Sequence, residues 1–367
     1  MTNDLLYQVA LTLIPQIGCV QARLLVERLG SAEAIFCAKG HQLEKIEGIG
    51  TIRAKSIKAF TAFHQAEKEI IFIEKYKIRP LFLTDQEYPQ RLLNCYDPPT
   101  MLYYRGNAPL NSSKIVAIIG TRSNTDYGRQ LTESLVNDLV SQQVLIVSGL
   151  AFGIDVIAHK TALKNKLPTV GVLAHGLDNI YPFQHSTLAK EIIKQDGGLL
   201  TEFRSATKPD KHNFPTRNRI VAGMSDAIII IESGNKGGSM VTAELGNGYN
   251  KDVFAFPGKI SDSKSAGCNF LIKNNKAILL TDADQLVQAM GWEENKKTTS
   301  KKQKELFIQL SPDEKIITDI LREKEQTHID ELNLRSGLSS SSVASAILTL
   351  ELQLVIQCMP GKMYRLI

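Results

Sequence analysis

The chain has 367 residues, a length that predicts two to three domains of roughly 100 to 200 residues each. Hydrophobic residues make up 43% and charged residues 22%, an ordinary balance for a folded globular protein, so the composition excludes global disorder. The net charge of +5 is too small to identify a nucleic-acid partner by itself, so the placement of the charges along the chain has to decide.

Nothing in the composition indicates disulfides, a metal site or a membrane segment. The five cysteines lie far apart, and none belongs to a Cys-x-x-Cys pair. The N-terminus lacks the basic and apolar regions of a secretion signal, and no apolar run approaches the ~18 residues that a membrane span needs. We therefore expect a cytoplasmic protein with reduced thiols, without a bound metal and without a membrane partner.

Residues 1–80 carry apolar side chains at helical spacing and predict a small helical domain. Within it, residues 14–18 and 46–50 form short turns with an apolar residue ahead of a glycine, as in helix-hairpin-helix or SAM-like domains. Such turns can present backbone N–H groups to phosphate. Because no cation follows the first turn closely, a structural or protein-contact role is favoured over DNA contact.

Residues 81–293 begin with a proline-containing connector, residues 88–106, which has to be extended or turned because proline interrupts regular helix. From Lys114, short apolar runs alternate with helical segments, as in a doubly wound α/β fold. The candidate strands are residues 115–119, 144–147, 169–173, 198–201, 227–231, 253–256 and 277–280. We therefore predict an extended Rossmann-like parallel sheet with its ligand beyond the carboxyl ends of the strands.

The residues that follow these strands predict an anion site. Gly237, Gly238 and Ser239 open a helix, so free N–H groups and the positive helix end would face a phosphate. Arg122 follows the first strand, where a nicotinamide-binding protein has a glycine-rich turn, and the sequence contains no P-loop motif. These patterns argue against a nicotinamide enzyme and a P-loop ATPase, and no cofactor is predicted.

The stretch 211–219 and the residues just before it gather cations around Phe214. The cations are Arg204, Lys208, Lys211, Arg217 and Arg219. Since Lys and Arg bind phosphate while an aromatic ring stacks on any base, the stretch predicts contact with single-stranded nucleic acid. A basic run on its own is often only a solvated loop. Asn218 either holds this loop in shape or donates to DNA.

No catalytic constellation is recognisable. Asp155 and His159 lie one helical turn apart, which could indicate a metal pair or an acid/base couple, but the sequence places no third ligand. We interpret Asp155 as a helix N-cap and His159 as a hydrogen-bonded core residue. Ser148 and Ser239 lack an identifiable His/Asp relay, so nucleophilic catalysis has little support.

Residues 294–304 are polar and Lys-rich and predict a flexible linker. Residues 305–367 follow with helical patterns at 312–322, 329–337 and 339–352 and strand patterns at 355–359 and 363–366, the order of a winged helix. The third helix begins with Ser339 to Ser342 and offers no Arg or Lys there. This favours protein interaction or weak backbone contact over specific base reading.

Taken together, motifs at the strand ends resemble those of the DNA-processing DprA family, also called Smf. The matching motifs are residues 116–122, 148–155, 214–220 and 237–243. The resemblance covers the whole sheet domain, and the flanking helical and winged-helix domains fit it more loosely. It implies a non-enzymatic protein that binds single-stranded DNA, protects incoming strands and loads a RecA-type recombinase during natural transformation.

The resemblance also implies roles for individual residues. Phe214 would stack on a base, and the turn 237–239 would supply backbone donors. The side chains implied to contact phosphate are Arg122, Lys211, Arg217 and Arg219. The family is typically dimeric through the sheet domain, which we would place near residues 269–280.

The strongest alternative is an enzyme, a nucleotide phosphoribohydrolase of the lysine-decarboxylase-like (LOG) group. That group shares the sheet type and a Gly-Gly turn before a helix, and such a turn cradles phosphate in a binder and a hydrolase alike. Its turn continues with Gly-Thr, a step that is missing after Gly238, although Glu244 keeps an acidic residue nearby. A purely structural adaptor would leave the cations around Phe214 without a purpose.

Overall fold

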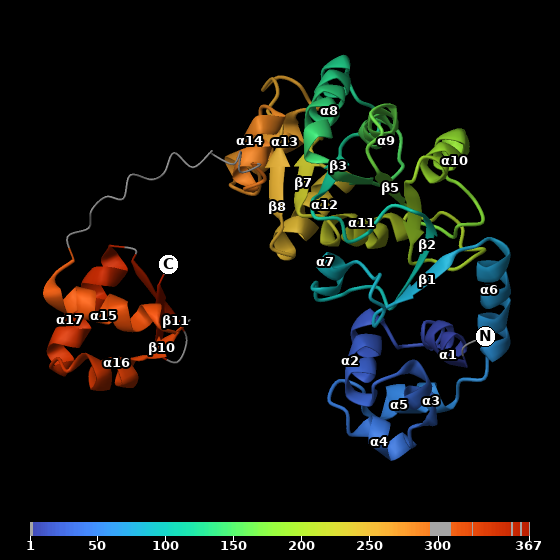
Figure 1. Ribbon diagram of the computed structural model, residues 1–367. Helices are drawn as coiled ribbons and strands as arrows, with labels where there is room; N and C mark the ends of the chain where they lie inside the picture. The colour runs from blue at the N-terminus through green and yellow to red at the C-terminus, as the bar shows by residue number, and fades with distance from the viewer. Residues whose placement is uncertain (1–2, 294–309, 325, 354, 360–361, 367) are drawn as a thin grey trace. The chain divides into compact units, whose positions relative to one another are not determined.

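The computed structural model describes residues 3–293, 310–324, 326–353, 355–359 and 362–366 (Figure 1). It divides into two compact units, residues 1–293 and 294–367, and each unit is described by itself. The predicted Lys-rich linker, residues 294–304, lies outside the described residues. No described helix has the length and apolar composition needed to cross a membrane.

The first unit opens with a cluster of short helices. They are α1 (Asn3–Leu11), α2 (Cys19–Leu29), α3 (Ala32–Cys37), α4 (Gly40–Glu44), α5 (Gly50–Lys58) and α6 (Phe63–Lys75). Apolar side chains at helical spacing, such as Leu11, Leu25 and Ile57, are buried in one common core. Phe82, ahead of the connector, and Met101 within it join the same core, so the helices pack directly on the edge of the sheet.

Within the described residues, a nine-stranded sheet forms the body of this unit. In spatial order the strands are β1 (Arg79–Phe82), β2 (Met101–Gly106), β6 (Gly198–Thr201), β5 (Thr169–Val172), β4 (Leu145–Ser148), β3 (Ile115–Ile119), β7 (Ala227–Ile230), β8 (Asp252–Ala255) and β9 (Ile278–Leu279). Strands β3 to β9 are parallel, which confirms the predicted Rossmann-like sheet.

Two strands that the sequence did not predict extend the sheet, β1 ahead of the connector and β2 within it. β2 pairs antiparallel with β6, and β1 pairs with β2 at the outer edge. Pro80 lies in β1, where an edge strand tolerates a missing backbone donor. The connector was expected to be free of helix, and this was wrong at α7 (Gln90–Leu93), a four-residue helix that starts directly after Pro89. A proline ahead of the first helical turn costs no backbone hydrogen bond, so it does not prevent a helix from starting there.

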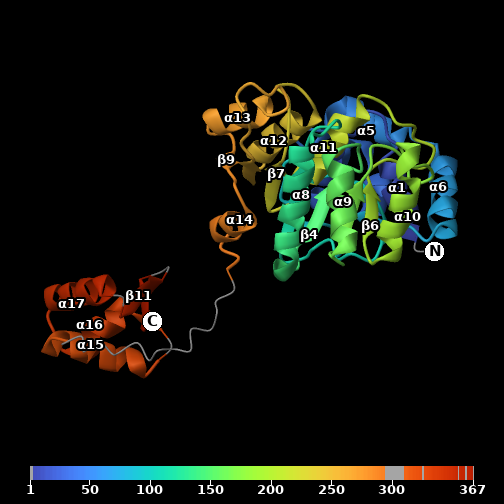
Figure 2. The same ribbon diagram turned by 90° about the horizontal axis from the view of Figure 1, so that it is seen from above.

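Helices cover both faces of the sheet, and β3 shows how the sequence directs this. Val116 and Ile118 point to one core, and Ile115, Ala117 and Ile119 point to the other. The first face packs on α8 (Asp126–Asp138), α9 (Ile154–Lys164) and α14 (Ala283–Ala289), and α10 (Ser186–Lys194) lies beside α9 (Figure 2). The second face packs on α11 (Asn213–Gly223), α12 (Gly238–Gly248) and α13 (Ala266–Lys273).

The second unit is a winged helix, as predicted. Its elements are α15 (Pro312–Arg322), β10 (Thr327–His328), α16 (Ile329–Ser336), α17 (Ser340–Leu352), β11 (Ile356–Met359) and β12 (Met363–Leu366). The order β10-β12-β11 is the wing, and β10 is a short strand that the sequence pattern did not indicate. Ser311 and Glu314 form a reciprocal capping box that starts α15.

His159 lies in the core of the first unit, as the sequence interpretation expected. Its Nδ1 lies 2.7 Å from the Thr169 hydroxyl, which itself donates to the Ile146 carbonyl, so Nδ1–H is the donor. Its Nε2 is buried without a hydrogen-bond partner among the described residues. Burial, followed by the charges of His185 and Arg217, lowers the pKa of His159 to about 3.

This environment makes His159 a determinant of acid stability. In the unfolded chain the imidazole takes up a proton near pH 6.5, while the folded protein keeps it neutral, so its stabilising contribution is present above that pH. The contribution is lost by up to about 1.4 kcal/mol per pH unit as the pH falls below this value.

We expect the pH dependence of the unfolding free energy between pH 7.5 and 5 to flatten in His159→Leu. Urea denaturation followed by circular dichroism would measure this, with His41→Gln, an exposed histidine of α4, as the matched control. A constant offset between the wild type and His159→Leu across this range would contradict the assignment.

Candidate nucleic-acid interface

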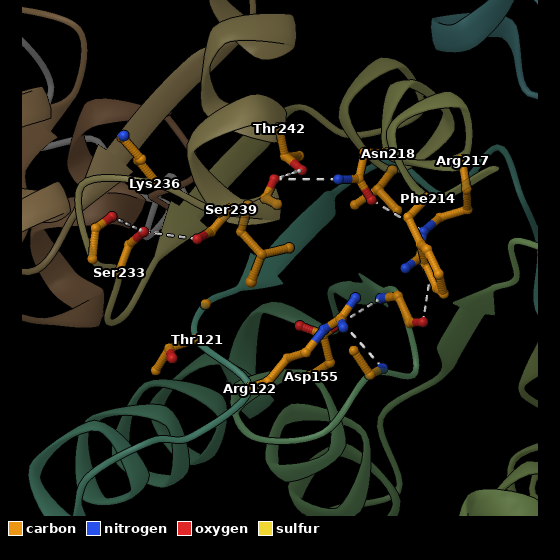
Figure 3. A pocket seen from close by; sticks show the side chains of 18 residues that line it. Thr121, Arg122, Asp155, Phe214, Arg217, Asn218, Ser233, Lys236, Ser239 and Thr242 are labelled. Atoms are coloured by element: carbon orange, nitrogen blue, oxygen red, sulfur yellow. Dashed lines mark hydrogen bonds between the residues drawn. The ribbon is translucent and has the colours of Figure 1, made fainter. Parts of the chain in front are cut away.

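A pocket lies at the carboxyl edge of the sheet where the strand order reverses. Chain order runs outward from β3 through β4, β5 and β6, and then returns to β7 on the other side of β3. The loops after β3, β4 and β7 and the first turns of α11 and α12 surround a cavity of about 430 Å³ (Figure 3). Ligands of open α/β sheets bind at such a switch point, and the volume suits a nucleotide-sized group.

Arg217 forms the floor of this pocket. It is buried, and its guanidinium donates to the carbonyl oxygens of Gly149 and Val172 and, over 3.1 Å, to Asn218 Oδ1. Burial lowers the pKa of Arg217 to about 10, while Asp155 opposes this shift, so the side chain stays charged near neutral pH. It therefore gives the pocket a positive potential, but its donors are largely committed to the protein.

Asp155 differs from the sequence interpretation. The N-cap of α9 is Gly153, and Asp155 lies in the first helical turn instead. Its Oδ2 accepts from the backbone N–H of Gly149 (3.1 Å) and Ala151 (3.3 Å), so it holds the loop that lines the pocket. Burial raises the pKa of Asp155, and the Arg217 charge counteracts that rise. The short loop places Gly153 at the cap because its φ of +79° favours glycine.

Arg219 was expected to contact phosphate, and the structure places it elsewhere. The side chain is buried, pairs with Glu202 after β6 and donates to the backbone carbonyl of Asp97 in the connector. It does not line the pocket. Although it follows Arg217 by only two positions, it fastens α11 to the connector, and sequence proximity alone could not separate the two roles.

Three predicted site residues lie at or near the pocket mouth. Arg122 and Lys211 are exposed, and Phe214 is half-buried at the start of α11. The Arg122 guanidinium lies 5.2 Å from the centre of the Phe214 ring, a distance suited to a cation–π contact. Phe214 and Arg122 line the pocket, whereas Lys211 lies outside its lining. A cation and a ring surface thus stand together where a strand would enter.

The predicted glycine turn forms the opposite wall (Figure 3). Gly237 caps α12 with φ of +149°, and the exposed first turn directs backbone N–H groups outward. The Ser239 hydroxyl lies 2.8 Å from that of Ser233, so it is engaged within the protein. Asn218 Nδ2 donates to the Gly238 carbonyl over 3.2 Å while its Oδ1 accepts from Arg217. Asn218 therefore holds the wall in shape.

Two residues at this edge were missed by the sequence reasoning. Lys236 is exposed and lines the pocket, and its position just before the Gly-Gly turn was the available signal. Glu232 is buried and accepts from the backbone N–H of Thr125 over 2.9 Å and from the Thr125 hydroxyl. Thr125 is the N-cap of α8, so a carboxylate from the loop after β7 occupies the helix end that follows β3.

The acidic residue of the enzyme alternative lies outside the pocket. Glu244 forms a surface ion pair with Lys276 at 2.6 Å and does not contribute to the pocket lining. Ser148 donates to the Ile118 carbonyl over 2.6 Å, so its hydroxyl serves the sheet. Among the described residues, no cluster of His, Cys, Asp and Glu could hold a metal ion.

Comparisons with known families cover most of the chain. Residues 79–291 match the family described as DNA recombination-mediator protein A, and residues 303–362 match the DprA winged helix domain. Residues 8–71 match the helix-hairpin-helix motif. Protein Smf of Synechocystis is 35% identical over 78% of this chain and 72% of its own length, and Protein Smf of Escherichia coli is 32% identical over 82% and 80%.

Solved structures agree with these matches. The DNA processing protein A of Streptococcus pneumoniae superposes with a TM-score of 0.65 and 31% identity, covering 79% of this chain and 98% of that one. The Helicobacter pylori protein superposes with a TM-score of 0.53 and 33% identity, covering 59% and 96%. The latter is described as binding single-stranded DNA.

Because Arg217 is buried and Arg122 is exposed, we expect replacement by alanine to destabilise the protein strongly at position 217 and hardly at all at position 122. Arg217→Ala should lower the unfolding free energy by about 3 to 5 kcal/mol, because it leaves the Asp155 carboxylate and two carbonyl groups buried without their partner. Arg122→Ala should change it by less than about 0.5 kcal/mol, as for an ordinary surface position. Urea denaturation of both variants beside the wild type measures the difference; equal stabilities would show that Arg217 is not a structural cation.

Proposed function

Because the chain belongs to the DNA recombination-mediator protein A family, also known as DprA or Smf, we propose that it binds single-stranded DNA at the β3–β7 edge of the sheet. The observation that carries this proposal is the juxtaposition of Arg122 with the Phe214 ring opposite the open first turn of α12. One side of the pocket offers a cation and a stacking surface, and the other offers backbone donors.

Each group has a distinct task in this proposal. Arg122, Lys211 and Lys236 neutralise phosphates, because they are exposed and can reach a flexible strand. Gly237 and Gly238 direct N–H groups to a phosphate at the positive end of α12. Phe214 stacks on a base. Since neither phosphate nor ring stacking reads base identity, binding should tolerate any sequence.

Arg217 and Arg219 take structural tasks instead. Arg217 holds the pocket floor and contributes positive potential from below. Arg219 anchors the back of α11. Asn218 and Ser239 shape the opposite wall through their contacts with Gly238 and Ser233.

We also propose that the chain acts as a binder rather than an enzyme. The hydroxyls of Ser148 and Ser239 are engaged with other groups of the protein, and the surface ion pair of Glu244 keeps that carboxylate from the pocket. Incubation with nucleoside monophosphates should release no free base. Release that disappears in Glu244→Gln would overturn this part of the proposal.

The bound strand would then be handed to a RecA-type recombinase in the cytoplasm during natural transformation. This part of the proposal is supported by the description of the family as a DNA recombination mediator. We further propose a homodimer through the sheet domain. Phe270 on α13 and Ile278 and Leu279 on the terminal strand β9 are exposed apolar side chains at one edge. A second copy of this edge would cover them and the unpaired side of β9.

The salt dependence of binding tests the phosphate contacts. Affinity for single-stranded DNA should fall with salt with a log–log slope of about −0.7 for each phosphate neutralised. Arg122→Ala and Lys211→Ala should each weaken binding to all sequences alike and make the slope less negative by about 0.7. Fluorescence anisotropy over a salt series measures this, with single-stranded and duplex DNA compared. Absent or salt-insensitive binding would contradict the proposal.

The stacking role of Phe214 is tested separately. Phe214→Ala should weaken binding by roughly 1 to 3 kcal/mol without changing the salt slope, because the ring contacts a base and no phosphate. The same anisotropy titration measures both quantities. Wild-type affinity in this variant would assign Phe214 to local packing, with Arg122 as its partner.

A further inference from the structure

Beyond Phe214, the same edge of the sheet carries an aromatic ledge. We use this name for Phe152, Tyr181 and Phe183, whose exposed fractions are 44%, 50% and 83%. Phe152 follows β4, and Tyr181 and Phe183 follow β5, so all lie beyond carboxyl strand ends. Aromatic rings are ordinarily buried, and their gathering on one exposed edge indicates a binding surface.

Two residues of the ledge, Phe152 and Tyr181, are continuous with the pocket. Phe152, Tyr181 and Phe214 line one recess together, and the rings of Tyr181 and Phe214 lie 6.1 Å apart with an interplanar angle of 51°. The recess holds about 30 Å³, against about 430 Å³ for the pocket, so it cannot enclose a base. A base would therefore stack on the outer face of a ring. Because the Tyr181 and Phe214 rings are tilted relative to each other, each ring would stack on a different base.

The loop that carries the ledge is fixed by two buried histidines. His175 Nε2 accepts from the Tyr181 N–H over 3.2 Å, and its Nδ1–H donates to the Gly176 carbonyl over 2.9 Å. His185 donates from Nδ1 to the Leu150 carbonyl over 2.8 Å. Both imidazoles are buried beneath the loop. The backbone of the loop that carries Tyr181 is thus held in position before a ligand arrives, which lowers the entropic cost of binding.

A basic loop lies alongside. The segment after β6 that leads to Lys208 is bonded to the loop of the ledge, since Gly176 N–H donates to the Thr207 carbonyl (3.1 Å) and Ala206 N–H to Asp178 (3.0 Å). Lys208 is exposed. An exposed cation therefore lies on the loop next to the one that carries Tyr181 and Phe183, and a cation beside aromatic rings suits the phosphates and bases of one strand.

From these contacts we propose that the aromatic ledge is a second base-stacking subsite, in which Tyr181 and Phe183 stack on bases next to the one held by Phe214. The inference rests on the proposed binding of single-stranded DNA and extends its path from the α12 turn across Phe214 to the loop after β5. The occupant is the same strand, because Tyr181 lines one recess together with Phe214 and Arg122, and the exposed Lys208 lies on the adjoining loop.

Tyr181→Leu and Phe183→Leu test the subsite, since leucine keeps an apolar side chain and removes the ring. Each should bind a long oligothymidine roughly 5- to 140-fold more weakly than the wild type. The salt slope should stay unchanged, because no phosphate contact is lost. Tyr181→Phe should retain wild-type affinity. Full-length proteins are compared by anisotropy after thermal melting has shown that each variant is folded.

Two controls separate stacking from indirect effects. The first is an abasic strand of the same length, which both variants should bind as the wild type does because it has no base to stack. The second is Tyr76→Leu, a similarly exposed tyrosine at the end of α6, which should leave binding unchanged.

The outcomes distinguish this inference from the proposed function. If the wild type fails to bind oligothymidine, both are wrong. If Phe214→Ala weakens binding while both leucine variants bind like the wild type, only the second subsite is wrong. If the leucine variants bind the abasic strand more weakly by the same factor as oligothymidine, the ledge only positions its loop, and the second subsite is wrong. Unchanged DNA affinity with lost recombinase loading would identify a protein-binding surface and overturn it as well.

Discussion

The buried charge of Arg217 is the constraint on which the carboxyl edge of the sheet depends. A cation in the interior is tolerated only when its partners are supplied, and here the carbonyls of Gly149 and Val172 and the charge of Asp155 supply them. The buried guanidinium also requires glycine at position 149, because a Cβ there would lie 2.5 Å from it. The loops after β4 and β5 are consequently fixed around α11 before any ligand arrives.

One helix therefore serves two kinds of task. Arg217 and Arg219 fasten α11 to the sheet and to the connector, and Phe214 is left at its exposed start beside Arg122. Buried cations keep a defined position and add potential through a poorly screening interior, while exposed cations can follow a mobile strand. A rigid floor with adjustable cations at the mouth suits a ligand whose phosphates are regularly spaced but whose bases vary.

The fold could be predicted from the sequence because continuous apolar runs identify strands buried on both faces, and β3 and β6 begin and end as expected. The strands β1 and β2 could not be predicted, because the pairing of β2 with β6 depends on a segment that is distant in the sequence. In the site, the glycine turn and Phe214 were recognisable from their own residues. The tasks of Arg217, Arg219 and Asn218 were not, because burial and hydrogen-bond partners decide them, and these partners come from Gly149, Glu202 and Gly238.

Glu232 explains why this sheet is suited to a strand rather than to a dinucleotide. In dinucleotide-binding sheets the helix after the first strand receives the pyrophosphate at its N-terminus. Here the Glu232 carboxylate accepts from the N–H and the hydroxyl of Thr125, the cap of that helix, α8, so a negative group already stands at this helix end and an added anion would be repelled. The start of α12 at the switch point is open instead, with Gly237 and Gly238 exposed at the rim. An anion site at a rim allows a polymer to enter and leave on both sides, which a closed turn would prevent.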